Sequence, residues 1–298
     1  MPSLIDIRRR IRSVKNTQQI TKAMKMVSAA KLRRAQERAV ASRPYAGMMS
    51  RVLANLAAAA KNDERVTDLP LLQTREEKRI QLIVVSSDRG LAGAFNANLL
   101  RMVQRFLDEH RGAEIRIEAI GKKGRDYFRK RDYTVTGEHV GVIERPTYEL
   151  AREIGDKLID QYRKSEVDAV YIARNEFKNV MAPNLVLSKI LPVELPQEEK
   201  QGQENDQGRE GPPEMDYIFE QSPDELLKAL LPRYVEMEIY RAMLESNSAE
   251  HAARMTAMDT ASSNAGDVIQ TLTLNMNRVR QASITREIIE IVSGAAAL

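Results

Sequence analysis

Two long stretches with helical spacing of apolar residues lie at the two ends of the chain. From Ser3 to about Ala60 good helix formers dominate, and neither glycine nor proline occurs before Pro44. Apolar residues there recur at steps of four and three, in two sets, Ile7, Ile11, Val14 and Ile20, Met24, Val27. The step between the sets is six residues rather than seven, so the apolar stripe should change face there.

The middle of the chain has a different pattern, with short apolar runs separated by turn residues at 80–87, 114–120, 168–175 and 185–193. Between the first three runs lie helical patterns, the clearest of which places on one face Phe95, Leu99, Val103 and Phe106. Strands that alternate with helices predict a parallel or mixed α/β sheet. The last run follows its predecessor too closely for a crossover helix, so we expect it to pair antiparallel.

The helical pattern returns at Pro223, and Pro232 lies early enough to kink or restart the helix. Farther on, apolar residues are spaced 4, 3 and 4 positions apart, at Ile284, Ile288, Ile291 and Ala295. This spacing is typical of a coiled-coil seam. One helix over 233–296 would be about 95 Å long at 1.5 Å per residue. A compact chain of this length is only about 50 Å across, so the helix should project as a stalk.

The fold class predicted from these patterns is α/β with long helices. The N- and C-terminal helices should form an antiparallel coiled coil that carries a central Rossmann-like α/β domain. We expect residues 1–60 and 216–298 to form the shaft and 75–195 the globular foot domain. Residues 196–214 contain glycine and proline but no apolar residue, which predicts a flexible, disordered connection.

Composition narrows the possible functions. The 298 residues include no cysteine, which excludes disulfides and thiolate chemistry and fits a reducing compartment. No apolar run approaches the roughly 20 residues that span a bilayer, and the basic start lacks the apolar core of a secretory signal.

Positive charge is concentrated near the start of the chain, although the net charge is only +4. No acidic residue interrupts a run of ten basic ones, Arg8, Arg9, Arg10, Arg12, Lys15, Lys22, Lys25, Lys31, Arg33 and Arg34. Such a surface attracts phosphate, lipid headgroups or a carboxylate-lined protein, unless it is simply a solvated helix face.

Two glycine-containing segments resemble phosphate loops only in part. SSDRGLAGAFN (86–96) follows a buried-type strand and opens a helix, but it fits neither GxGxxG nor GxxxxGK[ST], so a tight turn is the favoured interpretation. GKKG (121–124) is interpreted as a turn with exposed lysines. The three histidines show no metal-binding spacing. We therefore predict no catalytic residue, cofactor or metal.

The last helix carries the most specific signal. Polar groups lie beside the apolar seam and could hydrogen-bond the carboxylates of a partner, namely Arg280, Gln281, Thr285 and Glu290. After Glu290 no charged side chain follows, which is unusual for a chain end, since chain ends are normally solvated. The alternative is an ordinary solvated face, but the segment is poor in charge.

Three stretches together resemble the γ subunit family of the F-type ATP synthase. They are IRRRIRSVKNTQQITKAMKMVSAAKLRRAQ, SSDRGLAGAFN and MDTASSNAGDVIQTLTLNMNRVRQASITREIIEIVSGAAAL, and the likeness covers essentially the whole chain. The resemblance implies a central rotor shaft in the bore of an α3β3 ring, which couples ion-driven rotation of a c ring to the catalytic cycle of the β subunits. The chain itself would be non-catalytic.

The resemblance also implies contact residues. Arg280, Gln281, Thr285 and Glu290 would meet the β subunits, as would Met24 and Lys25, which match the region facing an acidic segment of β. An apolar sleeve would hold the tip, formed by Ile291, Val292, Ala295, Ala296 and Leu298. The foot contacts with the c ring and the ε subunit would include Tyr217 and Glu220.

The resemblance places the protein at the cytoplasmic face of a bacterial cell membrane, as a peripheral protein associated through the complex only. Ala92 stands where many relatives have cysteine, and the cysteine-bearing insertion of plant chloroplast members is absent. Two other functions stay open. A nucleic-acid-binding coiled coil would use the basic helix and show steep salt dependence, but does not explain the uncharged tip. A nucleotide-dependent enzyme would need ATP or NAD binding by the isolated chain. We expect no nucleic acid partner.

Overall fold

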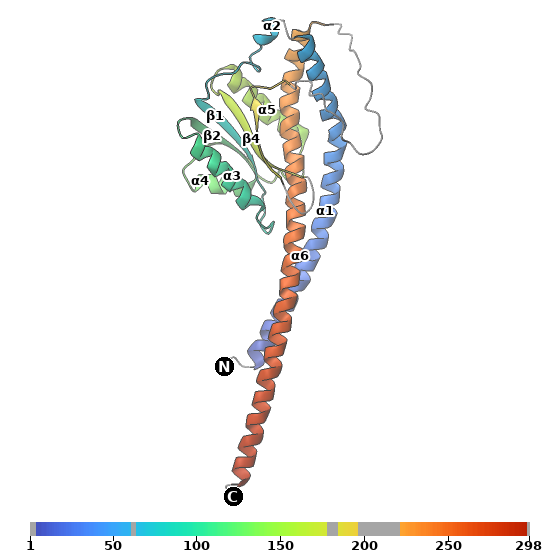
Figure 1. Ribbon diagram of the computed structural model, residues 1–298, viewed down its shortest axis with the longest axis vertical. Helices are drawn as coiled ribbons and strands as arrows, with labels where there is room; N and C mark the ends of the chain where they lie inside the picture. Colours follow the sequence, from blue (N-terminus) through green and yellow to red (C-terminus); the bar gives the residue numbers. More distant parts are fainter. Residues whose placement is uncertain (1–3, 61–63, 178–183, 196–220, 297–298) are drawn as a thin grey trace.

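The computed structural model describes residues 4–60, 64–177, 184–195 and 221–296. Two long helices run side by side, and a sheet domain lies against one end of the pair (Figure 1). The helices and strands of the described chain, besides the short α2 (Glu64–Thr67), are α1 (Leu4–Ala59), β1 (Arg79–Val85), α3 (Phe95–Glu109), β2 (Glu114–Ile120), α4 (Lys122–Arg129), β3 (Val135–His139), α5 (Tyr148–Arg163), β4 (Ala169–Glu176), β5 (Asn184–Leu191) and α6 (Pro223–Ala296).

The helices α1 and α6 form the predicted antiparallel pair. They make the most extensive contact between any two elements of the described chain. With 56 and 74 residues, they are about 84 Å and 111 Å long. The free end of α6 therefore extends well beyond the N-terminal end of α1, as Figure 1 shows. This confirms that the last helix projects as a stalk.

The helical pair uses small polar residues where apolar ones were expected. Ile7 of the first apolar set is buried, but Ile20 and Val27 of the second set are exposed. Thr21 and Ser28 take the buried positions instead. Ser262 Oγ of α6 lies 2.7 Å from Thr21 Oγ1, a hydrogen bond that needs close helix approach and small side chains.

The sheet has the strand order β3-β2-β1-β4-β5. Its first four strands are parallel, and β5 pairs antiparallel with β4, as the short connection predicted. Periodicity located the other four strands but not β3, whose sequence VTGEH lacks an apolar run. At the sheet edge, Gly137 of β3 passes so close to the Glu118 carboxylate that a Cβ there would collide with it.

Helices cover both faces of the sheet. One face packs on α3 and α4, where Leu99, Val103 and Phe106 are buried as predicted. Phe95 is also buried, but in a separate cluster with Ala92 and with Ala249 of α6. The other face packs on α5, the end of α1 and the first part of α6, with Leu53 and Ile239 fully buried. Because Leu231 and Val235 are buried on either side of Pro232, packing holds α6 continuous there, and the predicted restart is wrong.

Candidate interaction surface on the paired helices

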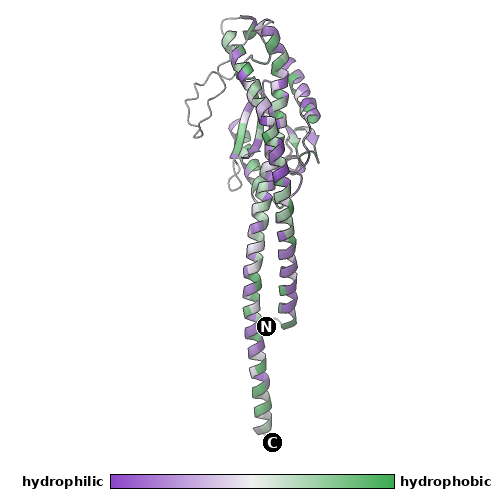
Figure 2. Ribbon diagram, turned by 90° about the vertical axis from the view of Figure 1, so that its right-hand side faces the viewer, coloured by the Kyte–Doolittle hydropathy of each residue, from purple (hydrophilic) through white to green (hydrophobic). Residues whose placement is uncertain are grey.

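The free part of α6 carries an apolar stripe without a partner. Ala265 is the last buried residue of α6 among those whose side chains the structure describes. Beyond it Ile284, Ile288 and Ile291 keep the spacing of a seam, yet each is about half exposed or more because α1 does not reach them. This seam therefore has no partner among the described residues, although the hydrophobic character of the free end of α6 is plain in Figure 2.

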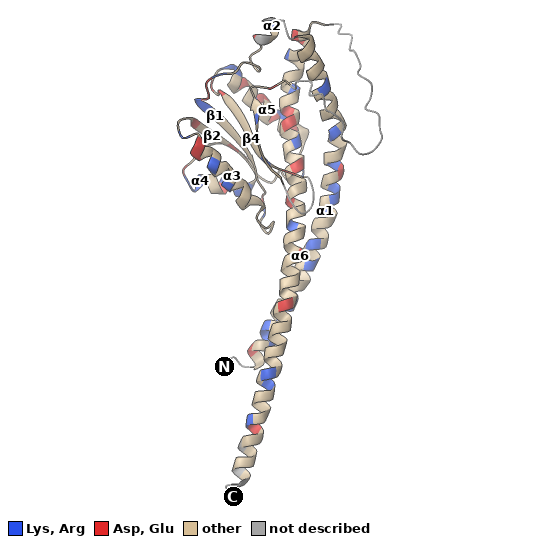
Figure 3. Ribbon diagram, in the orientation of Figure 1, with Lys and Arg blue, Asp and Glu red and all other residues tan. Residues whose placement is uncertain are grey.

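The predicted polar contact residues lie on the same free segment. Arg280, Gln281 and Thr285 are exposed, and Thr285 Oγ1 donates a hydrogen bond of 2.9 Å to the Gln281 carbonyl. Arg280 forms no ion pair with any described residue, and Figure 3 shows few charged residues along the free end of α6. These groups are available for contacts outside the chain.

The predicted tip residues lie at the end of α6. Ile291, Val292 and Ala295 are exposed. Glu290 and Ala296 belong to the helix, but their side chains are outside the description, as is the whole of Leu298. The foot residues Tyr217 and Glu220 also lie outside the described residues.

Part of the basic run on α1 is engaged inside the chain. Met24 and Lys25 are half-buried, and Lys25 Nζ lies 2.6 Å from Asp259 Oδ1 of α6. Lys31 pairs with Glu144. Others in the run, including Arg8, Arg12 and Lys22, are exposed. Figure 3 shows Lys and Arg residues at intervals along α1. The ion pair of Lys25 could not be predicted from local sequence patterns, because its partner is 234 residues away.

The SSDRGLAGAFN segment forms a tight strand-to-helix turn, in agreement with the favoured interpretation. Leu91 and Gly93 adopt left-handed backbone conformations, with φ of 63° and 56°. Asn96 at the start of α3 closes the turn, since its Oδ1 accepts a 3.1 Å hydrogen bond from the Ser87 amide. The turn also reaches the shaft, because Gly90 O accepts a 3.2 Å hydrogen bond from Arg254 Nη2 of α6.

The Arg254 side chain that contacts Gly90 also belongs to a buried ion pair on α6. Arg254 Nη2 lies 2.6 Å from Glu250 Oε1, and both side chains are about nine-tenths buried. Burial raises the pKa of Glu250, although Arg254 opposes this. Burial, with help from the Arg254 charge, also lowers the pKa of His251 to about 4, so this imidazole is neutral at physiological pH. The pattern of the sequence gave no sign of this cluster.

The remaining motifs lie where the sequence indicated. Gly121 of GKKG joins β2 to α4, and the other three residues begin α4, with both lysines exposed. Among described residues no group of three or more His, Cys, Asp or Glu could hold a metal ion. Within the same residues, no helix combines the length and apolar character that crossing a bilayer requires.

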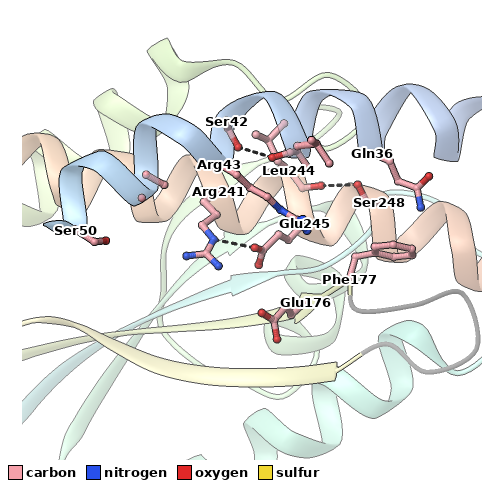
Figure 4. A pocket seen from close by; sticks show the side chains of 14 residues that line it. Gln36, Ser42, Arg43, Ser50, Glu176, Phe177, Arg241, Leu244, Glu245 and Ser248 are labelled. Atoms are coloured by element: carbon pink, nitrogen blue, oxygen red, sulfur yellow. Dashed lines mark hydrogen bonds and ion pairs between the residues drawn. The ribbon is translucent and has the colours of Figure 1, made fainter. Parts of the chain in front are cut away.

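A groove of about 590 Å³ separates α1 from α6 beside the end of β4. Figure 4 shows Gln36, Ser42 and Arg43 of α1 opposite Leu244 and Ser248 of α6. Arg241 Nε donates a 2.8 Å hydrogen bond to Glu245 on its own helix. The two helices are therefore not in continuous contact near the sheet domain.

Comparisons with known proteins place this geometry in a family. The family model described as ATP synthase matches residues 3–298. A curated relative from Solibacter usitatus, named ATP synthase gamma chain, is 58% identical over 100% of this chain and 99% of its own length. The chain belongs to the ATP synthase gamma chain family. A relative of the same name from Pelotomaculum thermopropionicum is 46% identical over the full length of both chains.

Chains in solved structures of ATP synthases have a similar fold. A chain in the mitochondrial ATP synthase of Euglena gracilis is similar with a TM-score of 0.64 at 21% identity, covering 99% of this chain and 94% of the other. A chain from the central stalk and c ring of the Tetrahymena thermophila enzyme gives 0.60 at 23% identity, covering 82% and 99%. The predicted family and fold class are confirmed, as is a non-catalytic subunit of ATP synthase rather than a free-standing enzyme.

Proposed function

We propose that this chain is the central rotor shaft of an F-type ATP synthase. It couples ion-driven turning of a c ring to the conformational cycle of catalytic β subunits in an α3β3 ring, and it carries out no bond chemistry itself. In this proposal residues 1–60 and 216–298 form the shaft, and 75–195 form the domain at its foot.

One observation carries the proposal, namely the unpaired end of α6. A helix that leaves its partner and exposes Ile288, Ile291 and Val292 would be an aggregation hazard in a protein that worked alone. The same stripe suits an apolar sleeve. Small and aliphatic side chains make no directional hydrogen bonds or ion pairs, so a tip made of them can turn without breaking such bonds at each step.

The shaft is asymmetric, which is what sequential control of three sites requires. Near its middle one side is the basic face of α1, while beyond α1 a single helix remains (Figures 1 and 3). Each β subunit therefore meets a different surface at any moment. A subunit changes its preferred conformation only through such differences in contact free energy, so turning the shaft shifts the three populations in order.

The proposal includes the contacts that the family resemblance implies. Arg280, Gln281, Thr285 and Glu290 would hydrogen-bond the β subunits, and Met24 and Lys25 would face their acidic surface. Exposed ion pairs contribute at most about 1 kcal/mol each, so charge would guide the contact without locking it. Residues 291–298 would turn in the sleeve, and Tyr217 and Glu220 would meet the c ring and ε. The complex would lie at the cytoplasmic face of a bacterial membrane, with this chain as a peripheral subunit.

Reconstitution tests the proposal. We would mix the purified chain with α and β subunits from the same source and weigh the product by native mass spectrometry. The expected species contains one copy of the chain on a hexamer of three α and three β, with ATPase activity that depends on the chain. A free chain beside an unaltered mixture of folded α and β subunits would overturn the proposal.

A further inference from the structure

A second hollow, of about 230 Å³, lies where the shaft meets the sheet domain. Three elements line it. Lys31, Arg34 and Arg38 come from one face of α1, at helical spacing. The loop between β3 and α5 and the facing side of α6 supply Glu144, Arg145, Asn247 and His251.

The hollow has an excess of positive charge. Four cations line it against one carboxylate, and that carboxylate is already engaged, because Glu144 pairs with Lys31 and lies 3.6 Å from Arg89 Nη2. The hydrogen bond from Lys31 keeps the pKa of Glu144 below its ordinary value, so Glu144 is ionised at neutral pH. Arg34, Arg38 and Arg145 form no ion pair with any described residue. Three unpaired guanidinium groups around one concavity raise the local concentration of anions.

Two buried side chains add neutral hydrogen-bonding groups. His251 is 5% exposed, and its Nδ1 lies 3.5 Å from Arg254 Nη1, a donor, so the ring proton belongs on Nε2. Asn247 is 3% exposed, and its Oδ1 has no hydrogen-bond partner although its Nδ2 lies 3.4 Å from Glu144 O. An unpartnered buried acceptor is costly, so it indicates a missing donor.

We propose that this hollow binds a phosphate-class oxyanion, held by Arg34, Arg38 and Arg145, as free phosphate or as the terminal phosphate of a nucleotide. A planar guanidinium group can donate two parallel hydrogen bonds to two oxygens of the same phosphate. A phosphate that keeps one proton also donates an O–H, which suits the Glu144 carboxylate. The hollow is too small for a protein helix, which is about 10 Å wide. A bound oxyanion would tie α1 to the Arg145 loop and thus the shaft to the sheet domain.

Calorimetric titration of the full chain with inorganic phosphate at low ionic strength tests the proposal. The double variant Arg38→Gln/Arg145→Gln should bind phosphate at least ten times more weakly than the unaltered chain. A matched control, Arg101→Gln/Arg105→Gln, removes the same charge from the exposed face of α3 and should change affinity less than twofold. Phosphate should also raise the melting temperature of the unaltered chain but not that of the pocket variant.

Further arms identify the source of the phosphate group. Competition between ATP and inorganic phosphate would assign the site to a nucleotide's terminal phosphate, and absence of competition would assign it to free phosphate. Sulfate, which carries no proton at neutral pH, should bind more weakly than phosphate. No saturable binding, equal loss in the control variant, or binding of an Asp/Glu-rich peptide but not of phosphate would each overturn the proposal. The rotor function would stand in every case, because it does not depend on this hollow.

Discussion

The two halves of α6 show that one helix can be stabilised in two ways. From Pro223 to Ala265 it packs against the sheet domain and α1, and residues such as Val235 and Ile239 are fully buried. From Gly266 onward no described side chain is buried. The first half is a helix because packing holds it there. Beyond the N-terminal end of α1, the second half has only its helix propensity and its continuity with the first half.

Because of this difference, apolar residues in the first half of α6 should stabilise the fold, whereas those in the second half should act in the assembled complex. Apolar residues occur in both halves, and their identity alone does not distinguish them. In the first half an isoleucine removes apolar surface from water during folding. In the second half the same residue remains in water until a partner covers it. Its contribution should therefore appear only in the assembled complex.

The strongest test is a matched pair of substitutions, Ile239→Ala and Ile288→Ala. Ile239 is fully buried and Ile288 is 55% exposed. Truncation at 239 leaves a cavity and should lower the free energy of unfolding by about 3 kcal/mol. Truncation at 288 should change it by less than about 0.5 kcal/mol. Urea unfolding of each purified chain measures both. A similar loss at the two positions would mean that the free half of α6 is packed in solution.

Buried charge in the sheet domain gives the next largest effect. Glu118 Oε1 lies 2.8 Å from His139 Nε2, and its Oε2 lies 2.9 Å from Lys157 Nζ. Glu118→Gln should cost about 2 kcal/mol, because hydrogen bonds to a charged group are lost. Glu114→Gln on the same strand is the control. Glu114 is exposed beside Arg116, so its loss should cost less than about 0.5 kcal/mol.

Acid titration tests the same group. Burial raises the pKa of Glu118, but the hydrogen bonds from His139 and Lys157 outweigh it and hold the pKa below the ordinary 4.5. The stabilisation is therefore complete above pH 4.5 and is lost as the pH falls through the lower folded pKa. Chemical denaturation at a series of pH values should show a shallower acid decline for Glu118→Gln. Parallel curves for the variant and the unaltered chain would contradict this assignment.

Local patterns predicted the long helices, four of the five strands and the exposed tip, because each is written in the spacing of nearby residues. They did not predict features that depend on distant segments. Ile20 and Val27 look like interface residues until α6 is placed beside Thr21 and Ser28. The Glu250 and Arg254 pair looks like an exposed helical pair until the turn at Gly90 covers it.

The polar groups on the free half of α6 should affect activity rather than stability. Arg280→Ala/Gln281→Ala removes exposed side chains that no described residue pairs with, so unfolding should be unchanged within about 0.5 kcal/mol. In the assembled enzyme the variant should synthesise ATP about tenfold more slowly, since charge-assisted hydrogen bonds each contribute about 1.5–3 kcal/mol. Arg278→Ala, two positions before the pair, is the control. Wild-type synthesis by the double variant would remove the role proposed for both residues.

The smallest effect on stability is expected at a solvent-exposed ion pair between α1 and α6. Lys25 and Asp259 form an ion pair whose side chains are 38% and 61% exposed, so Asp259→Asn should cost the isolated chain no more than about 0.5 kcal/mol, as should Lys25→Gln. In the assembled enzyme the two variants should differ. If Lys25 also faces a carboxylate of a β subunit, only Lys25→Gln removes a charge from that contact, and ATP synthesis should slow for this variant alone. Equal rates for the two variants would confine Lys25 to its bond with Asp259, and the contact with β would have to come from the unpaired basic residues beside it.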